Sequence, residues 1–411
     1  MRLPVRILPG VAALALVAVS SPGQNTSFEF EFGNRVSSGG TRVSPTNFYS
    51  ASSGFGFEPG ATVVAGDWFV AGTNPFYFSV KLPEGNYRVT ATLGGSTESI
   101  TTVKAELRRL MLEKIHIAAG KSEPRTFIVN LRTPTISTTN RVHLKPREQT
   151  TEICNWDDKL TLEFNGTHPS LHSLQIKKVE VPTVFLIGDS TVCDQPAEPW
   201  NSWGQMLPRF LKPHVAVANH AESGETVADS LQARRFEKVF SLMKPGDYLF
   251  IQFGHNDMKS RATNALEIYR ADLKQVVATT RALHGTPVLV TSMERKNGVE
   301  HETLADYPDA VREAAREENC ALIDLNAMSK VLYRALGTNL DKAFQDGTHH
   351  NNYGSYELAK CVVAGIKQAK LPLAKCIVDD FGDFDPAKPD AVTTFAMPAS
   401  PNVSAVKPLG N

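Results

Sequence analysis

A short apolar run that ends in a Gly-Asp-Ser turn, at residues 184–191, limits what this chain can fold into. The run reads Val-Phe-Leu-Ile-Gly-Asp-Ser-Thr. Four consecutive apolar residues before such a turn are typical of a strand buried on both faces of a parallel sheet. Gly188 permits a sharp turn, and a helix opening directly afterwards would point backbone N–H groups at an anion beside the Ser190 hydroxyl. The stretch therefore predicts an α/β domain whose first strand carries a serine suited to acyl transfer.

The length and charge of the chain bound the number of domains and the kinds of partner. A chain of 411 residues exceeds one ordinary domain, and its length predicts about two to three. Lys plus Arg equal Asp plus Glu at 43 each, so the formal net charge is zero. No large electrostatic field favours nucleic acid or an anionic membrane, and we expect neither as a partner.

Residues 1–24 have the organisation of an export signal. Arg2 and Arg6 precede the apolar run 11–19, which small residues and a proline follow. The run is too short to span a bilayer, and no later stretch is suited to do so. We therefore expect a secreted or periplasmic protein from which the signal peptide has been removed.

The cysteine pattern does not indicate a metal site. The five cysteines have neither C-x-x-C spacing nor a metal-ligand pattern, which argues against zinc; they are Cys154, Cys193, Cys320, Cys361 and Cys376. An odd number leaves at least one thiol unpaired. Disulfides are permitted in an exported protein, but the sequence does not determine the pairing.

Residues 25–181 show the period of two that is typical of β-strands. Apolar residues alternate with glutamate over 28–32, and the segments 76–80 and 87–93 flank the Pro-Glu-Gly-Asn sequence at 83–86. That arrangement predicts a hairpin. Further strands are expected at 125–131, 160–164 and 174–179. Many short strands without helical periodicity predict a β-sandwich.

The pattern over residues 182–378 changes to strands that alternate with amphipathic helices. Strands are expected at 184–187, 215–218, 248–253, 288–291 and 321–325, and helices near 202–211, 226–242, 264–283 and 307–318, with a last helix from about 353. Five such strands predict a parallel sheet between two helical layers, a three-layer α/β/α fold. Residues 379–411 are rich in Pro, Asp and small residues, which predicts a tail or an extension draped over the surface.

Candidate site residues follow the apolar runs, because ligands of open α/β sheets bind at the carboxyl ends of the strands. Ser190, Gly224 and Asn256 follow the first three strands, and Asp346 and His349 lie beyond the last. A serine hydroxyl needs a base within reach, and an imidazole with a carboxylate on its other ring nitrogen supplies one. The N–H groups of Ser190 and Gly224 and the Asn256 amide are suitable oxyanion donors, each worth about 3 kcal/mol of barrier.

Four blocks of the chain resemble those of the SGNH (GDSL-like) hydrolases in order and place. They are Gly188-Asp189-Ser190, Gly224, Gly254-His255-Asn256-Asp257 and Asp346-Gly347-Thr348-His349. Longer matches at 187–192, 219–225 and 346–354 are similar to the rhamnogalacturonan acetylesterase family of carbohydrate esterases. The resemblance covers roughly residues 183–375, about half of the chain. The G-x-S-x-G elbow of the α/β-hydrolases is absent at Ser190, which favours the SGNH fold.

The resemblance implies a flavodoxin-like α/β/α hydrolase fold and a catalytic triad of Ser190, His349 and Asp346. It further implies an oxyanion hole built from Ser190, Gly224 and Asn256, no cofactor and no metal, and acetylated pectic polysaccharide as the substrate. The family places the base three residues after the acid, so His349 is favoured over the adjacent His350.

Neighbouring side chains allow two interpretations each. Trp200 and Trp203 follow the nucleophile loop and either stack on a sugar face or pack in the core. Arg295 follows the fourth strand and either contacts a galacturonate carboxylate or lies in a solvated loop. His220 and His255 either face the cleft or have a structural role. Asp189 and Asp257 are expected to orient loops.

The sequence thus predicts a secreted serine esterase that deacetylates plant cell-wall polysaccharide, first of all the pectic rhamnogalacturonan backbone. One alternative is an acetylxylan esterase or a general SGNH esterase or lipase. Another is a catalytically inert carbohydrate-binding protein that uses the sandwich. The sandwich resembles galactose-binding-type modules, and Trp68, Tyr77 and Trp156 are either sugar platforms or core residues.

Overall fold

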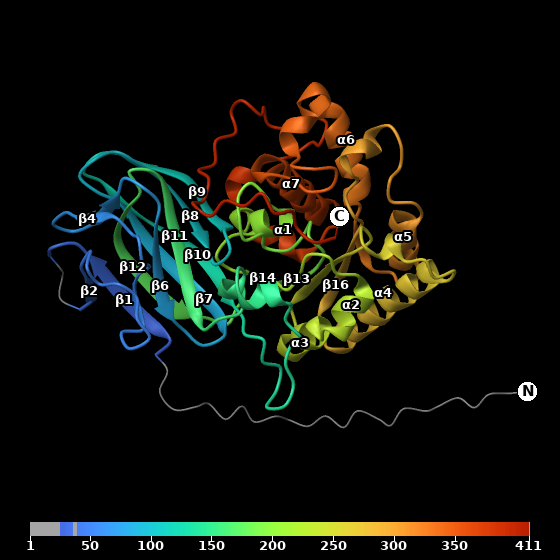
Figure 1. The fold of residues 1–411 in the computed structure, drawn as a ribbon, viewed down its shortest axis with the longest axis horizontal. Helices are drawn as coiled ribbons and strands as arrows, with labels where there is room; N and C mark the ends of the chain where they lie inside the picture. The colour runs from blue at the N-terminus through green and yellow to red at the C-terminus, as the bar shows by residue number, and fades with distance from the viewer. Residues whose placement is uncertain (1–24, 36–38, 411) are drawn as a thin grey trace, which may run out of the picture.

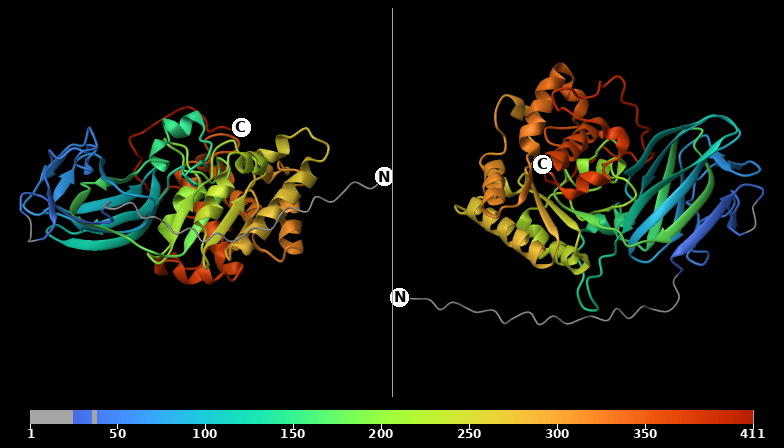
Figure 2. Two further views of the ribbon diagram at one scale, coloured as in Figure 1. Left: turned by 90° about the horizontal axis from the view of Figure 1, so that it is seen from below. Right: turned by 180° about the vertical axis from the view of Figure 1, so that it is seen from behind.

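A computed structural model describes residues 25–35 and 39–410, which form an all-β unit beside an α/β unit (Figure 1). The predicted signal peptide, residues 1–24, lies outside the described residues, as do 36–38 and 411. Two further views show the units side by side along the long axis (Figure 2). Within the described part, no helix is both long and apolar enough to cross a membrane.

The all-β unit is a sandwich of two sheets with one shared core. One sheet has the order β10-β7-β12-β1-β2, with β5 beside β12 and β4 beside β5, and the other has the order β3-β6-β11-β8-β9. The strands are β1 (Ser27–Phe32), β2 (Thr41–Val43), β3 (Phe55–Phe57), β4 (Val63–Ala65), β5 (Val70–Gly72), β6 (Phe76–Lys81), β7 (Gly85–Gly94), β8 (Ser99–Ala105), β9 (Arg109–Ile117), β10 (Ser122–Leu131), β11 (Lys159–Thr167) and β12 (Ser170–Lys178).

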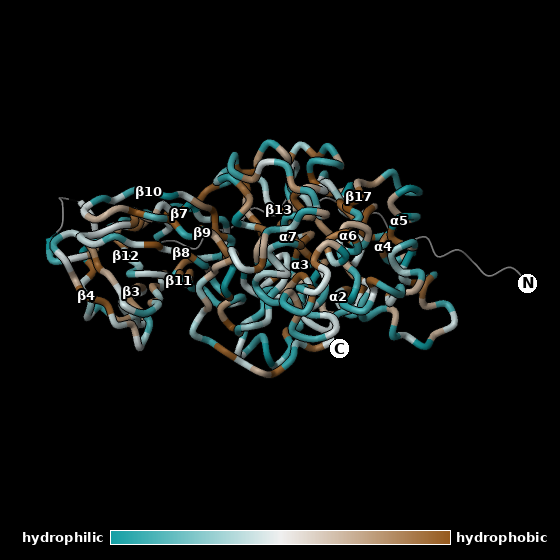
Figure 3. The backbone as a smooth tube through the Cα atoms, turned by 90° about the horizontal axis from the view of Figure 1, so that it is seen from above, coloured by the Kyte–Doolittle hydropathy of each residue, from teal (hydrophilic) through white to brown (hydrophobic). Residues whose placement is uncertain are grey.

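Aromatic rings join the two sheets of the sandwich. Phe30 and Phe32 of β1 lie edge-on to Phe78 of β6, with ring centroids 5.3 and 5.1 Å apart. Such edge-to-face pairs add to the stabilisation from burial. Figure 3 shows hydrophobic residues along the strands and hydrophilic residues on the outer loops.

The predicted hairpin between residues 76–80 and 87–93 is wrong. β6 pairs with β3 and β11, whereas β7 pairs with β10 and β12 in the other sheet. The connection at 83–86 therefore crosses from one sheet to the other. Alternation shows only that one face of each strand meets a core. It does not show whether two successive strands lie beside each other or across that core.

The α/β unit contains the predicted parallel sheet of five strands. Its order is β14-β13-β15-β16-β17, and every neighbouring pair is parallel. The strands are β13 (Thr183–Gly188), β14 (Ala216–Asn219), β15 (Tyr248–Gln252), β16 (Thr286–Val290) and β17 (Ala321–Ile323). All six residues of β13 are buried, as its continuous apolar sequence predicts.

Helices cover both faces of this sheet. Val184 and Leu186 share a core with α1, α6 and α7, and Phe185 and Ile187 share the opposite core with α2 to α5. The helices are α1 (Trp203–Met206), α2 (Val227–Gln232), α3 (Arg235–Leu242), α4 (Ala265–Ala282), α5 (Tyr307–Glu317), α6 (Leu325–Leu336) and α7 (Asn352–Gln368). Short 3-10 helices are η1 (Pro146–Gln149), η2 (Ile153–Asn155), η3 (Leu207–Phe210), η4 (Asp257–Lys259), η5 (Lys296–Val299), η6 (Gly337–Ala343), η7 (Pro372–Cys376) and η8 (Asp379–Phe381).

Helix α6 was not among the predicted helices. Its N-cap, Asp324, lies inside the strand predicted at 321–325. The Asp324 side chain accepts a hydrogen bond from the Ala327 N–H at 3.2 Å. The apolar residues of β17 run almost directly into the apolar face of α6. Hydropathy alone therefore gives no boundary between the two elements.

The described tail, residues 379–410, drapes over both units. Phe395 packs on Tyr353 and Tyr356 of α7, with centroids 5.4 and 5.3 Å away. Farther along, the Ser400 hydroxyl donates to Glu163 of β11 at 2.7 Å. The tail then returns across the α/β unit, as the red segment in Figure 1 shows.

A second connection between the units is the excursion at residues 133–158, between β10 and β11. Glu148 of η1 forms a bidentate ion pair with Arg235 of α3, at 2.9 and 2.7 Å, and the Trp156 indole donates to the same carboxylate at 2.9 Å. Both charged side chains are at most 1% exposed. Leaving one partner of such a pair alone in the interior costs about 3–5 kcal/mol.

We expect Arg235→Met to lower the free energy of unfolding by about 3–5 kcal/mol, because Glu148 would stay buried without its cation. The matched control is Arg234→Met, because the Arg234 side chain is 37% exposed and lies 3.7 Å from Glu237. An exposed pair of this kind contributes less than about 1 kcal/mol. Urea-induced unfolding measures both, and equal losses would contradict a structural role of the buried pair.

Candidate active site

Ser190 lies in a tight turn at the carboxyl end of β13. The Asp189 carbonyl accepts hydrogen bonds from the N–H groups of Val192 and Cys193, both at 3.0 Å. The chain then continues as a loop until α1 begins at Trp203. No helix opens directly after Ser190: one turn forms, and the following loop contains prolines, which cannot continue helical hydrogen bonding. The helical stretch predicted near 202–211 is present as α1 and η3.

The structure brings Ser190, His349 and Asp346 into one hydrogen-bonded chain. The Ser190 Oγ lies 2.8 Å from His349 Nε2, and His349 Nδ1 lies 2.9 Å from Asp346 Oδ2. Ser190 and His349 are each only 1% exposed. The arrangement has the geometry of a nucleophile, a base and a group that orients the base.

Asp346 is held as a carboxylate by the loop that carries it. Its Oδ1 accepts hydrogen bonds from the backbone N–H groups of Thr348 and His349, both at 2.7 Å. Burial alone would raise the pKa of Asp346, but these bonds and the His349 ring outweigh burial and hold that pKa below its usual range. The carboxylate is thereby suited to stabilise a protonated His349.

The adjacent His350 does not reach the serine hydroxyl. Its Nε2 lies 2.9 Å from the Tyr333 hydroxyl, and its ring packs against Phe344 with centroids 4.0 Å apart. Burial, together with the neighbouring His349, lowers the pKa of His350 to about 3. His350 is therefore a neutral core residue at physiological pH.

Three predicted oxyanion donors lie on loops at the same edge of the sheet. In the described structure the backbone N–H groups of Ser190 and Gly224 donate to no protein acceptor. Gly224 has a φ of +76°, a conformation that favours glycine. The Asn256 Nδ2 donates one hydrogen to the Glu225 carbonyl at 3.0 Å, which leaves its second hydrogen for a ligand.

The loop that carries Gly224 is fixed from outside the α/β unit. Lys145, in the 133–158 excursion, donates from Nζ to the Ser223 carbonyl at 2.7 Å and pairs with Glu225 at 2.7 Å. These contacts hold the residues on either side of Gly224. The position of one predicted oxyanion donor therefore depends on a segment inserted between two sandwich strands.

Asp189 and His255 orient the nucleophile turn. Asp189 accepts from the Thr191 N–H at 2.9 Å and from its hydroxyl at 2.7 Å, and lies 3.2 Å from His255 Nδ1. The other His255 nitrogen lies 3.0 Å from the Met293 carbonyl. Burial would raise the pKa of Asp189, but His255 and Thr191 lower it further than burial raises it.

His220 and Asp257 are buried beside the site with unpaired polar atoms. Within the described residues neither ring nitrogen of His220 has a hydrogen-bond partner, and the ring contacts Trp156 and Phe185. Burial, followed by nearby arginine and lysine charges, lowers the pKa of His220 well below its usual value. Asp257 accepts from the Val227 N–H at 3.0 Å, whereas its Oδ2 has no partner.

The predicted substrate-contact residues have different environments. Trp203 is 1% exposed and donates from its indole to Gln252 at 2.7 Å, so it belongs to the core and does not offer a face to a sugar. Trp200 lies edge-on to His349 with centroids 5.9 Å apart. Arg295 is half-buried and donates to the His255 carbonyl at 3.2 Å.

The three aromatic candidates of the sandwich are also distinct from one another. Trp156 lies within the excursion, where it is buried and donates its indole N–H to Glu148, and is therefore not a sugar platform. The Tyr77 hydroxyl donates to Glu163 at 3.3 Å. Trp68 is 42% exposed and is the candidate of the three that presents a free surface.

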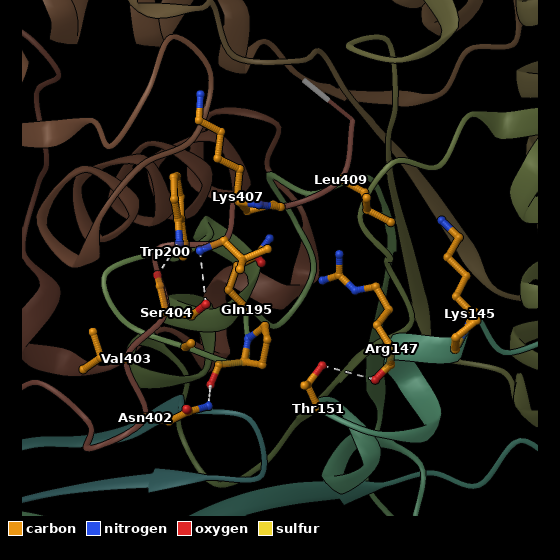
Figure 4. A pocket seen from close by; sticks show the side chains of 15 residues that line it. Lys145, Arg147, Thr151, Gln195, Trp200, Asn402, Val403, Ser404, Lys407 and Leu409 are labelled. Atoms are coloured by element: carbon orange, nitrogen blue, oxygen red, sulfur yellow. Dashed lines mark hydrogen bonds between the residues drawn. The ribbon is translucent and has the colours of Figure 1, made fainter.

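A cavity of about 680 Å³ adjoins the site (Figure 4). Its lining comes from the excursion, the nucleophile loop and the tail, and includes Arg147, Gln195, Trp200 and Leu409. Within the described residues, no cluster of three or more His, Cys, Asp or Glu is placed to hold a metal ion. The five cysteines are all free thiols.

Some residues that shape the site were not predicted. Gln195 donates from Nε2 to the Ser190 carbonyl at 2.8 Å, and Lys259 donates to the Asn256 Oδ1 at 3.1 Å. Lys145 was not predicted either. Gln195 and Lys259 lie within five residues of a predicted block. Their closeness to a block in the sequence could therefore have indicated a role beside the site. No sequence signal connects Lys145 to residues about 80 positions away.

Comparisons with known proteins show the family to which the chain belongs. Residues 186–355 match the model of the GDSL-like Lipase/Acylhydrolase family. The chain is 36% identical over 221 residues to rhamnogalacturonan acetylesterase RhgT of Bacillus subtilis (strain 168), a match that spans 48% of this chain and 95% of that protein.

Two further relatives come from the same organism. The chain is 32% identical over 212 residues to probable rhamnogalacturonan acetylesterase YesY, spanning 48% of this chain and 98% of that protein. It is 25% identical over 374 residues to uncharacterized esterase YxiM, spanning 83% of this chain and 91% of that protein. The last match is longer than the α/β unit and therefore includes part of the sandwich.

We expect Asp257 to make stability fall as pH rises from about 4 to 7. Burial raises the pKa of Asp257 to about 7 in the folded protein, above an unfolded value of about 3.9. The folded state therefore binds more protons in this interval, so raising the pH favours unfolding. Asp257→Asn should reduce this slope by up to about 1.4 kcal/mol per pH unit, measured by urea unfolding at several pH values. An unchanged slope would contradict the raised pKa of Asp257 in the folded protein.

Proposed function

Since the chain belongs to the GDSL-like lipase/acylhydrolase family, a family of carboxylic ester hydrolases, we propose that it is a serine esterase that removes acetyl groups from a plant cell-wall polysaccharide. The observation that carries the proposal is the hydrogen-bonded chain from Ser190 through His349 to Asp346. The substrate we propose is acetylated pectic rhamnogalacturonan, in keeping with the names of two relatives.

In the proposed first half-reaction, His349 Nε2 accepts the proton of Ser190 as the hydroxyl oxygen attacks the acetyl carbonyl. Asp346 stabilises the imidazolium that forms. The negative charge on the carbonyl oxygen is stabilised by the N–H groups of Ser190 and Gly224 and by the Asn256 amide. These donors are preorganised, so little reorganisation is needed when charge develops.

The first half-reaction ends when His349 gives its proton to the departing sugar oxygen and the sugar leaves; the second half-reaction is the hydrolysis of the acetyl-enzyme. The acetyl group then remains as an ester on Ser190. A water molecule attacks this ester with His349 as the base again, and acetate leaves as the hydroxyl is restored. Every proton in this cycle passes through His349, and the cycle requires no metal or cofactor.

Further parts of the proposal concern binding and location. We assign Arg295, beside His255, to contact with a uronate carboxylate of the substrate. Trp200 is 6% exposed and donates its indole N–H to Ser404, so it anchors the tail and does not offer a free face to a sugar. We assign polysaccharide binding by a galactose-binding-like module to the sandwich, where Trp68 presents an exposed ring. The charge and hydropathy pattern of residues 1–24 supports secretion or a periplasmic location.

We expect acetate release from acetylated rhamnogalacturonan to exceed release from acetylated homogalacturonan, acetylated xylan and a small acetyl ester. Ser190→Ala should lower kcat/KM by at least about 1000-fold on each substrate, because no other hydroxyl is activated by His349. Chromatographic measurement of acetate tests both points. Full activity of Ser190→Ala would refute the mechanism, and a preference for xylan or for the small ester alone would refute the substrate.

The two adjacent histidines provide a matched pair of variants. His349→Gln should lower kcat/KM by at least about 1000-fold, because the serine loses its base. His350→Leu should keep kcat/KM within about fivefold but lower stability by about 1–3 kcal/mol, because the buried Tyr333 hydroxyl loses its partner. Steady-state kinetics and urea unfolding test this assignment, and equal loss of activity in both variants would contradict it.

A further inference from the structure

The tail is anchored up to Ser404, next to the nucleophile loop. Glu198 donates from its backbone N–H to the Asn402 carbonyl at 2.8 Å and accepts from the Ser404 N–H at 2.9 Å. The Trp200 indole donates to the Ser404 carbonyl at 2.9 Å. Together with the Ser400–Glu163 hydrogen bond, these contacts fix residues 398–404 against both units.

The next residues, 405–410, lie over two of the predicted oxyanion donors. A Cβ atom built on Gly410 would lie 2.9 Å from the Gly224 Cα and 3.1 Å from the Asn256 Nδ2. A Cβ atom built on Gly224 would lie 3.1 Å from the Leu409 Cβ. Lys259 donates to the Gly410 carbonyl as well as to the Asn256 side chain. The chain's own backbone thus lies where a substrate carbonyl would have to approach these donors.

We propose that residues 405–410 are an autoinhibitory segment that covers the oxyanion donors and must move before an acetylated polysaccharide can bind. The inference rests on the proposed function. It accords with the burial of Asn256, which lies against Gly410 and is 7% exposed. The neighbouring cavity does not replace this access route, because none of the three triad residues is part of its lining.

The covering segment is held much more weakly than its anchor. Val406 is 78% exposed and Leu409 is 51% exposed, and Pro408 is the buried residue of the segment. Among the described residues, the hydrogen bonds of 405–410 are the one from Lys259 and one from the Val406 N–H to the Ser404 hydroxyl. Few buried contacts are typical of segments that open locally without global unfolding. The number of holding contacts falls directly after Ser404. We therefore place there the hinge about which the covering segment moves.

Two variants open the site without changing any triad or oxyanion residue. In the first, the chain ends at Ser404. In the second, Gly410→Ala in the full chain, at a φ of +100°, places a methyl group 2.9 Å from the Gly224 Cα, a backbone atom that cannot rotate away, so the segment is displaced. The matched control is Gly382→Ala, earlier in the tail, where φ is +64° and a Cβ would meet no atom within 4 Å. It carries similar backbone strain without the clash.

The test combines hydrolysis of 4-nitrophenyl acetate and acetylated rhamnogalacturonan with amide hydrogen exchange over residues 222–226 and 254–260. Both opening variants should exchange faster in these two loops. If the covered form is favoured tenfold, they should also show about tenfold higher kcat/KM than the full chain. Gly382→Ala should match the full chain in both measurements. Thermal unfolding confirms that each variant is folded.

The outcomes separate this proposal from the function it rests on. Unchanged exchange in both opening variants overturns the covering segment, whether or not the protein is an esterase. Faster exchange without a rise in kcat/KM overturns inhibition. Unchanged kcat/KM would mean that the segment has no effect on catalysis, and reduced kcat/KM would mean that the segment helps to form the site. Faster exchange with no hydrolysis by any variant, the full chain included, refutes the proposed function and with it the inhibition, while the seating of the segment stands.

Discussion

A carboxylate buried in a protein interior stays charged when a cation or several hydrogen-bond donors stabilise it, and the Glu148–Arg235 pair meets this condition at the junction of the two units. The pair fixes the 133–158 excursion against α3. Lys145 in the same excursion then reaches the carbonyl of Ser223. The geometry of the loop around Gly224 therefore depends on charged side chains of the excursion and of α3, and these contacts join the sandwich to the hydrolase unit.

The site itself follows from the parallel sheet. All strands point the same way, so the loops that carry Ser190, Gly224 and Asn256 emerge at one edge. Each loop is then fixed by local polar contacts rather than by apolar packing: Asp189 and His255 hold the first, and Lys259 holds the third. Such fixed dipoles are suited to stabilise a charge that appears only during a reaction.

The sequence predicted the parallel sheet and the Ser190–His349–Asp346 arrangement because both leave local signals. A strand buried on both faces appears as a continuous apolar run, and chemistry placed at strand ends appears as short polar blocks. Pairing between distant segments leaves no such signal. Alternation could not distinguish a hairpin from a crossing between sheets at 83–86, and the partners Glu148 and Arg235 are 87 positions apart. The path of the tail depends on the same kind of long-range contact.

The anchor at Ser404 makes the last described residues a ligand tethered beside its own binding site. Gly410 lies six positions after Ser404, and a short flexible connection of this kind gives an effective local concentration in roughly the millimolar range. A segment with an intrinsic dissociation constant of similar size would then fill the site about half the time. The fraction of time that the segment covers the oxyanion donors therefore depends on the length of this connection as much as on the contacts of the segment. Insertions between Ser404 and Gly410 would change that fraction gradually.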